Sequence, residues 1–107
     1  MSWDIEGWVE VDGNRIPLCD RNYTNNCNNM IRAAGWADWS GGFDGILSSA
    51  ELLSRLEPAR DALASEVARF DAMNPPNGWG SRSTLVDLFS EIILVAQKFP
   101  SAKWSAY

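Results

Sequence analysis

The sequence predicts an α+β fold, in which a small antiparallel sheet, formed by an N-terminal hairpin and a C-terminal strand, packs against three or four helices. Two observations indicate this class. Polar and apolar residues alternate near the N-terminus with the period of a strand, whereas apolar residues after position 24 recur at helical spacing. The length of 107 residues is that of one domain, which we expect to span residues 1–107.

The sheet is predicted to begin as a hairpin that pairs residues 3–11 with residues 14–19. Apolar and acidic residues alternate from Trp3 onward, and an Asp-Gly-Asn turn sequence separates the two strands. Pro17 has no N–H to donate, which confines the returning strand to an edge. Because a two-stranded hairpin is marginal in water, residues 102–107 are predicted to add a third strand.

Three stretches of helical periodicity are separated by loops at 35–45 and 74–80. Thr24 is predicted to cap a short helix with an apolar side formed by Cys27, Met30, Ile31 and Ala34. Ser48 or Ser49 caps the second, which Pro58 kinks or divides, and its apolar stripe includes Leu52, Leu53, Leu56, Ala59, Leu63, Val67 and Phe70. Ser81 or Ser83 caps the third, in which the apolar stripe comprises Leu85, Leu88, Phe89, Ile92, Ala96 and Phe99.

The composition of the chain limits the functions that it can have. Nine basic and 14 acidic residues give a net charge of −5, all of it within residues 1–53, which disfavours nucleic-acid binding and suits docking on a basic protein. Histidine is absent, so Ser-His-Asp and Cys-His catalysis and histidine-bound metals are excluded. Cys19 and Cys27 are expected to be reduced thiols of an intracellular protein. No apolar run reaches the roughly 20 residues of a membrane span, and no secretory signal is visible.

The sequence shows no set of nucleophile, base and orienting group. Carboxylate pairs such as Asp38 with Asp44 have no supporting motif. The prediction is therefore a protein that is not an enzyme and that has no cofactor and no metal site. Metal binding by carboxylates alone is the alternative that the sequence leaves open.

The first candidate surface is acidic and contains tryptophan. Six tryptophans in a chain this short exceed ordinary usage, and Trp8 lies on the acidic side of the first predicted strand. Trp8 and one of Trp36 or Trp39 are expected to be exposed anchors for a protein partner, with core filling as the alternative. The proposed partner-binding residues are Glu6, Trp8, Glu10, Asp12, Trp36, Asp38 and Trp39.

The second candidate is a polar ligand site. Asparagines crowd residues 22–29, where they oppose helix propensity, which makes the cluster a candidate hydrogen-bonding surface. The alternative is that they serve only as caps and as the polar side of a helix. The 74–80 loop leads into a helix N-terminus of the kind that binds phosphate or carboxylate, and Trp79 is placed to stack on a base. The alternative for this loop is a rigid connection with Trp79 in the core. The predicted ligand-binding residues are Tyr23, Asn25, Asn26, Asn29, Trp79, Ser81 and Arg82.

Several stretches together resemble a family of small uncharacterised proteins of bacteriophages, prophages and bacterial genomes. They are Asn22-Tyr23-Thr24-x-Asn26 before a short helix, Asn74-Pro75-Pro76-Asn77-Gly78-Trp79-Gly80-Ser81 before a long one, and the ending Pro100-x-Ala102-x-Trp104. The resemblance covers nearly the full chain. It implies a phage setting, in which small acidic proteins often inhibit host defence, as anti-CRISPR proteins do. The loop from Trp36 to Gly45 is richer in tryptophan and glycine than the family pattern.

The leading functional hypothesis is a non-enzymatic inhibitor that binds a host defence protein, such as a CRISPR effector, in the cytoplasm of the host cell. The alternative is a protein that binds or sequesters a small nucleotide signal. We expect a monomer or a weak homodimer. Leu94 lies on the polar side of the last helix, which predicts either a dimer contact there or a cover formed by residues 102–107.

Overall fold

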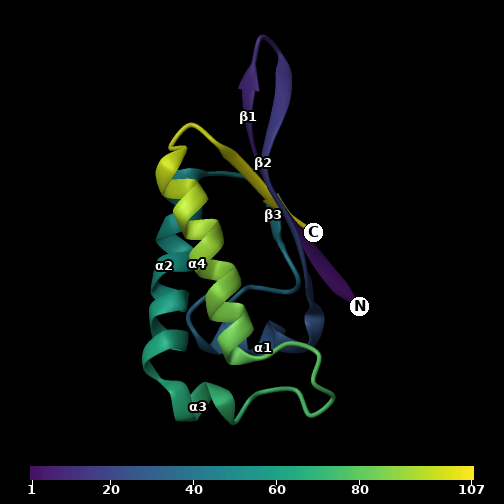
Figure 1. Ribbon diagram of the computed structural model, residues 1–107, viewed down its shortest axis with the longest axis vertical. Coiled ribbons are helices and arrows are strands. Elements are labelled where there is room, and N and C mark those ends of the chain that lie inside the picture. The colour runs from purple at the N-terminus through teal and green to yellow at the C-terminus, as the bar shows by residue number, and fades with distance from the viewer.

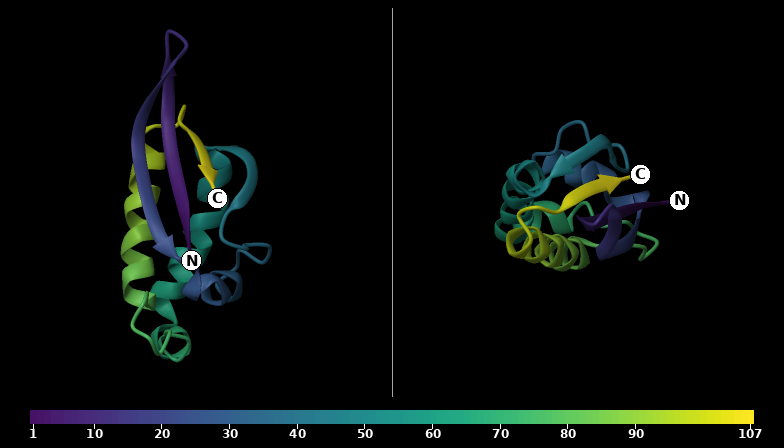
Figure 2. Two further views of the ribbon diagram at one scale, coloured as in Figure 1. Left: turned by 90° about the vertical axis from the view of Figure 1, so that its right-hand side faces the viewer. Right: turned by 90° about the horizontal axis from the view of Figure 1, so that it is seen from above.

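A computed structural model describes residues 1–107 as a four-stranded antiparallel sheet with helices on one of its faces (Figures 1 and 2). The strand order is β2-β1-β4-β3, where β1 is Ser2–Val11, β2 is Asn14–Thr24, β3 is Phe43–Ser48 and β4 is Lys103–Ala106. The hairpin of β1 and β2 projects beyond the rest of the molecule (Figure 1). The predicted α+β class, the hairpin and the C-terminal strand are confirmed.

The second strand of the hairpin is longer than the predicted 14–19, because its pairing continues until Thr24 lies opposite Ser2. β2 is an edge strand, as Pro17 predicted. The register shifts by one residue beside this proline, where Leu18 has no partner on β1. A bulge accommodates the missing donor, and the strand then resumes its pairing along the polar stretch that sequence alternation alone does not mark.

The third strand, β3, was not predicted. Phe43 begins this strand inside the segment 35–45, which the sequence predicts to be a loop. Gly45 has a φ of 72°, and this left-handed residue interrupts the strand and its alternation. At Gly42 a Cβ atom would collide with the carbonyl oxygen of Ala106, so glycine allows the chain to come against β4. The glycines that indicated a loop therefore serve an irregular edge strand.

Four helices and one 3₁₀ turn lie between β2 and β4 in the chain, with β3 among them. They are the 3₁₀ turn η1 (Asn25–Cys27), α1 (Asn28–Ala33), α2 (Ser49–Ser65), α3 (Val67–Asp71) and α4 (Arg82–Lys98). Three predicted caps are confirmed, with Thr24 capping η1, Ser48 capping α2 and Ser81 capping α4. None of these helices combines the length and the apolar character that crossing a membrane requires.

Three expectations about the helices are wrong. Pro58 does not divide the second helix, because the chain passes through it as one helix and leaves helical geometry only at Glu66, where φ is −97° and ψ is 61°; the kink at Pro58 stays a prediction. Val67 and Phe99 are exposed rather than inward-facing, because each lies at the end of its helix, where the apolar stripe no longer faces the sheet. The remaining stripe of α4 is buried as predicted.

The tryptophans form much of the core. Trp39 packs edge to face on Trp3 and on Trp36, with ring centroids 4.9 and 5.0 Å apart. The expected exposure of Trp8 and of Trp36 or Trp39 is therefore wrong, since their exposed fractions are only 4%, 2% and 2%. Trp8 does lie on the outer face of the sheet, where the Arg15 guanidinium sits 4.2 Å from its ring centre and covers it.

Leu94 stays exposed, with 53% of its surface accessible. Residues 103–106 pair with β1 and β3 and do not fold back over α4, so the predicted cover is wrong. The dimer contact through Leu94 stays a prediction.

Gly7 allows β4 to bring its tryptophan onto the sheet. An added Cβ at Gly7 would approach the benzene part of the Trp104 indole to 2.5 Å, and Trp104 is fully buried. We expect Gly7→Ala to lower the free energy of unfolding by about 1–3 kcal/mol, the usual effect of overpacking. Urea denaturation measures this loss. In a Trp104→Phe background, which lacks the second ring, Gly7→Ala should cost distinctly less, and equal losses in both backgrounds would contradict the steric explanation.

Candidate ligand-binding cleft

A cleft of about 800 Å³ opens where the end of β2 and η1 meet the loop before α4. This volume is within the range of small-molecule sites. The lining residues come from the N-terminus, from β2 and η1, and from the 77–84 segment; they are Met1, Ser2, Asn22, Tyr23, Thr24, Asn26, Asn77, Trp79, Gly80 and Thr84.

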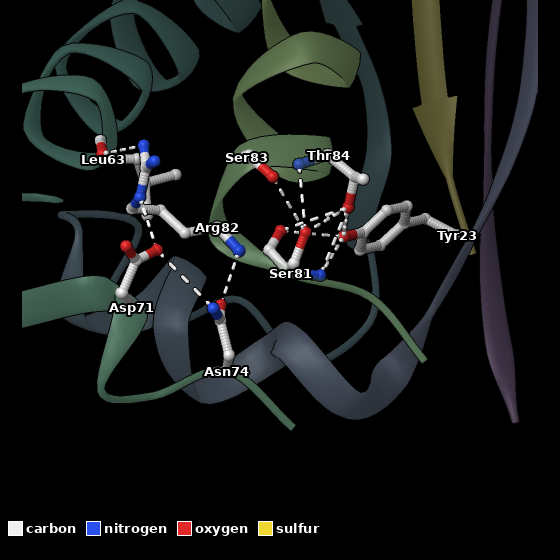
Figure 3. Close-up of polar contacts among 8 residues, drawn as sticks. All are labelled: Tyr23, Leu63, Asp71, Asn74, Ser81, Arg82, Ser83 and Thr84. Carbon is white, nitrogen blue, oxygen red and sulfur yellow. Dashed lines mark hydrogen bonds and ion pairs between the residues drawn. The ribbon is translucent and has the colours of Figure 1, made fainter. Parts of the chain in front are cut away.

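The Tyr23 hydroxyl joins the two walls of the cleft (Figure 3). It accepts a hydrogen bond from the Ser81 backbone N–H at 3.1 Å, and it lies 2.8 Å from Thr84 Oγ1 and 3.2 Å from the Ser81 carbonyl oxygen. Burial raises the pKa of the Tyr23 phenol, so the group stays protonated at neutral pH and keeps its donor. The sheet edge and the start of α4 are thereby held together.

Gly80 brings the loop into close contact with the opposite wall. A Cβ atom at this position would lie 2.7 Å from the Thr24 methyl carbon, 2.9 Å from Cys27 Sγ and 3.1 Å from the Tyr23 hydroxyl oxygen. Its φ of 87° is also one that glycine adopts most readily. Glycine is thus required here for both space and backbone conformation.

Trp79 stands at the rim of the cleft with 69% of its surface exposed, whereas the other five tryptophans are buried. The alternative in which this residue fills the core is therefore wrong. Its backbone N–H donates to Asn77 Oδ1 at 3.0 Å, an Asx turn that fixes the loop. The indole face is thus presented to solvent from a constrained backbone.

Side-chain amides around the cleft have unused hydrogen-bonding capacity. The Asn26 side chain makes no hydrogen bond within the protein, and Asn77 uses only its oxygen, so its amide nitrogen is free. Asn22 donates to Ser2 Oγ, the Trp3 carbonyl and Asp4 Oδ1 at 3.0–3.2 Å, which leaves its own side-chain oxygen unused. These side chains therefore give the cleft both donors and acceptors, none of them charged.

The arginines near the cleft are already engaged. Arg21 forms a two-pronged ion pair with the Glu91 carboxylate at 2.6 and 2.7 Å. Arg82, which the sequence placed in the site, points away from Tyr23 and pairs with Asp71 at 2.8 Å (Figure 3). No lining residue carries a charged side chain. The cleft has no free cationic side chain for a phosphate.

The N-terminus of α4 is also occupied from within. The Ser81 N–H donates to the Tyr23 hydroxyl, the Arg82 N–H donates to Asn74 Oδ1 at 2.7 Å, and the Thr84 N–H donates to Ser81 Oγ at 3.2 Å. Of the first N–H groups of the helix, which would otherwise bind an anion, the Ser83 N–H alone has no acceptor within the protein. The geometry thus gives little support to the expected phosphate or carboxylate contact at this terminus.

The structure brings together part of the predicted ligand site. Tyr23, Asn26 and Trp79 line the cleft, and Ser81 supports it through Tyr23. Asn25 instead accepts a hydrogen bond from Asn28 at 3.2 Å, and Asn29 accepts one from Arg32.

Sequence reasoning missed Asn22, Asn77 and Gly80 as individual site residues. Asn22 belongs to the asparagine cluster that drew attention, and the other two belong to the rigid loop. The residue composition of these two segments was therefore the only feature of the sequence that pointed to the three residues.

The predicted partner-binding residues do not form one surface. The three tryptophans among them are buried, and Asp38 pairs with Arg55 at 3.4 Å near the helices. Glu6 accepts a hydrogen bond from the Tyr107 hydroxyl at 2.8 Å, and Glu10 pairs with Lys103 at 3.3 Å, so both lie on the outer face of the sheet. Asp12 occupies the hairpin turn with a φ of 51°.

The two thiols are poorly suited to nucleophilic chemistry. Burial raises the pKa of Cys19 to about 11 and also raises the pKa of Cys27, so both stay protonated at neutral pH. No group of three or more cysteine, aspartate or glutamate side chains is arranged to hold a metal ion.

No known protein family, curated protein or solved structure matches this chain. The geometry of the cleft is therefore the main indication of function.

Gly80→Ala and Gly78→Ala separate backbone strain from close approach. Both glycines have φ near 80°, at 87° and 76°, but only a Cβ at Gly80 meets other atoms. We expect each variant to lose about 1 kcal/mol of stability from its backbone and Gly80→Ala to lose about 1–3 kcal/mol more. Urea denaturation gives the two losses. Equal losses would show that the loop does not press against the wall of the cleft.

Proposed function

We propose that this protein binds a small ligand with a flat, polar ring in the cleft and holds it without chemical change. The observation that carries this proposal is the exposure of Trp79 beside unused amides, in a chain that buries its five other tryptophans. Leaving so large an apolar side chain in water forgoes a substantial burial energy, which a stacked ligand would restore.

The rigidity of the site supports binding. Pro75 and Pro76 restrict the loop, the Asn77 turn fixes the backbone at Trp79, and Tyr23 attaches the start of α4 to the sheet. A site that is ordered before the ligand arrives loses little conformational entropy on binding. Such preorganisation suits sequestration, in which affinity matters and turnover does not.

The ligand class suggested by the sequence is a nucleotide signal, and a ring that stacks on tryptophan is consistent with it. Binding one ligand per chain would lower the free concentration of such a signal. The phage setting that the sequence predicts would suit this role, because removing a signal is one way to silence a defence response.

A ligand screen tests the proposal. With a nucleoside and nucleotide panel in large excess, we expect at least one compound to raise the melting temperature of the wild-type protein, as mass-action linkage requires; at about 100 times Kd the gain in stability is about 2.7 kcal/mol. Trp79→Ala should abolish the shift while leaving the unliganded melting temperature nearly unchanged, because the side chain is exposed.

Tyr107→Ala is the matched control, since Tyr107 is another exposed aromatic residue and lies away from the cleft lining. It should keep the ligand-induced shift. A shift that survives in Trp79→Ala, or the absence of any shift across a broad panel of ring compounds, would contradict ligand binding in the cleft.

A second candidate function is docking on a basic protein, the host-defence inhibitor of the leading hypothesis, in the host cytoplasm. One observation favours it. Glu6, Asp4 and Asp20 lie close enough to Tyr107 on the outer face of the sheet to raise the pKa of its phenol, the hydrogen bond to Glu6 being the main cause. Helices leave this acidic face uncovered (Figure 2). A positively charged groove would complement it.

Charge reversal distinguishes this role. Against purified CRISPR effector complexes, Glu6→Lys with Asp20→Lys should slow association by about tenfold at low salt, because electrostatic steering acts mainly on the on-rate. Glu57→Lys with Asp61→Lys places the same charge change on α2 and should have a smaller effect. Equal association rates for the two double variants would exclude the outer face as the interface.

A further inference from the structure

We infer that the cleft recognises an uncharged nucleobase or nucleoside through its ring edge, with the Asn26 and Asn77 amides as the reading groups and no phosphate contact. This inference rests on the proposed function and adds the chemical class of the ligand. The sequence predicts a nucleotide as the ligand, and the inference differs from this prediction only in that the phosphate is not recognised.

The electrostatics of the cleft disfavour an anion. Its ten lining residues carry no charged side chain, and the Arg21 and Arg82 guanidinium groups are neutralised by Glu91 and Asp71. The helix N–H groups of Ser81, Arg82 and Thr84 already have acceptors. With a net charge of −5 on the whole chain, a phosphate approaching the cleft is repelled at long range, and the α-ammonium group of the exposed Met1 is the only charged group among the lining residues.

The unused polar groups match a base edge instead. A side-chain amide presents a donor and an acceptor side by side, the arrangement with which asparagine pairs to a nucleobase edge. The Asn26 amide is wholly unused and the Asn77 amide nitrogen is free. Both lie in the cleft that Trp79 borders, so edge contacts and stacking are available to one ring.

The backbones that carry the two reading residues are attached to each other. Gly80 packs against Thr24 and Cys27, and the Tyr23 hydroxyl accepts a hydrogen bond from the Ser81 N–H, so these contacts attach the 77–81 segment to η1 and to the end of β2. Attached backbones favour discrimination between rings of similar size, because they limit the positions from which each amide can reach a ring edge.

Isothermal titration of the full chain tests the inference with a matched series: adenosine, guanosine, cytidine and uridine, their 5′-monophosphates, ribose 5-phosphate and a trinucleotide. We expect at least one nucleoside to bind, its monophosphate to bind no more tightly, and ribose 5-phosphate not to bind. The affinity for the nucleoside should be nearly constant between about 0.05 and 0.5 M salt, because no ion pair forms.

Asn26→Ala should weaken nucleoside binding by about tenfold to a hundredfold, the range for one lost two-point contact to a base. Asn25→Ala is the matched control, because the Asn25 side chain accepts a hydrogen bond from Asn28 and does not line the cleft. This substitution should change the affinity for the nucleoside by less than about twofold. Equal effects of the two substitutions would overturn the assignment of the reading group.

The other possible results of the titrations also test the inference. Binding that needs the phosphate, seen as a tighter monophosphate, a bound ribose 5-phosphate or strong weakening by salt, overturns this inference but leaves ligand binding in the cleft intact. Tighter binding of the trinucleotide with little salt dependence supports base reading and identifies a strand as its source. If a ring compound without a nucleobase binds through Trp79 and no nucleoside binds, this inference is overturned, whereas the proposed binding of a ring in the cleft is not.

Discussion

The contact between the Tyr23 hydroxyl and the first turn of α4 is the constraint on which the cleft depends. Tyr23 ends a strand and Ser81 begins a helix 58 residues later, yet one hydroxyl oxygen satisfies the Ser81 N–H and lies within hydrogen-bonding distance of Thr84 Oγ1. Beside it, Gly80 lets the loop backbone come against η1. Without this junction, the walls carrying Asn26 and Trp79 would belong to separate surface segments, and the amides and the indole would share no space.

The distribution of tryptophans follows from the size of the protein. A chain of 107 residues has little interior, and large rings fill it efficiently: Trp3, Trp39 and Trp104 are fully or almost fully buried between the sheet and the helices. Even Trp8, on the outer face of the sheet, is covered by Arg15. A protein that buries tryptophan so consistently makes its exposed one informative. The loop that carries Trp79 is stiffened by prolines and an Asx turn, so the exposure is built into the backbone.

Local signals predicted the fold well, because caps, turns and apolar stripes depend on neighbours in sequence. Thr24, Ser48 and Ser81 cap their helices as expected. Features that depend on distant contacts were not predictable. The alternation correctly placed Trp8 on the acidic face, but its burial depends on Arg15 across the hairpin. Asn25 and Asn26 are identical neighbours, yet one bonds inside the fold and the other lines the cleft, a difference that no composition argument resolves.

The acidic charge and the neutral cleft are separate properties of the molecule. Acidic side chains gather on the outer face of the sheet around Tyr107, whereas the cleft at the end of β2 presents amides, hydroxyls and one indole. The side chains of the cleft therefore contribute little Coulomb attraction to a ligand, and the attractive terms that they offer are ring stacking and hydrogen bonds from amides that water would otherwise occupy. Hydrogen bonds exchanged with water yield about 1 kcal/mol each, so affinity must come mainly from the buried face of the ring, and the amides contribute selectivity. The exposed indole is consequently the energetic centre of the site, and the asparagines decide which ring it accepts.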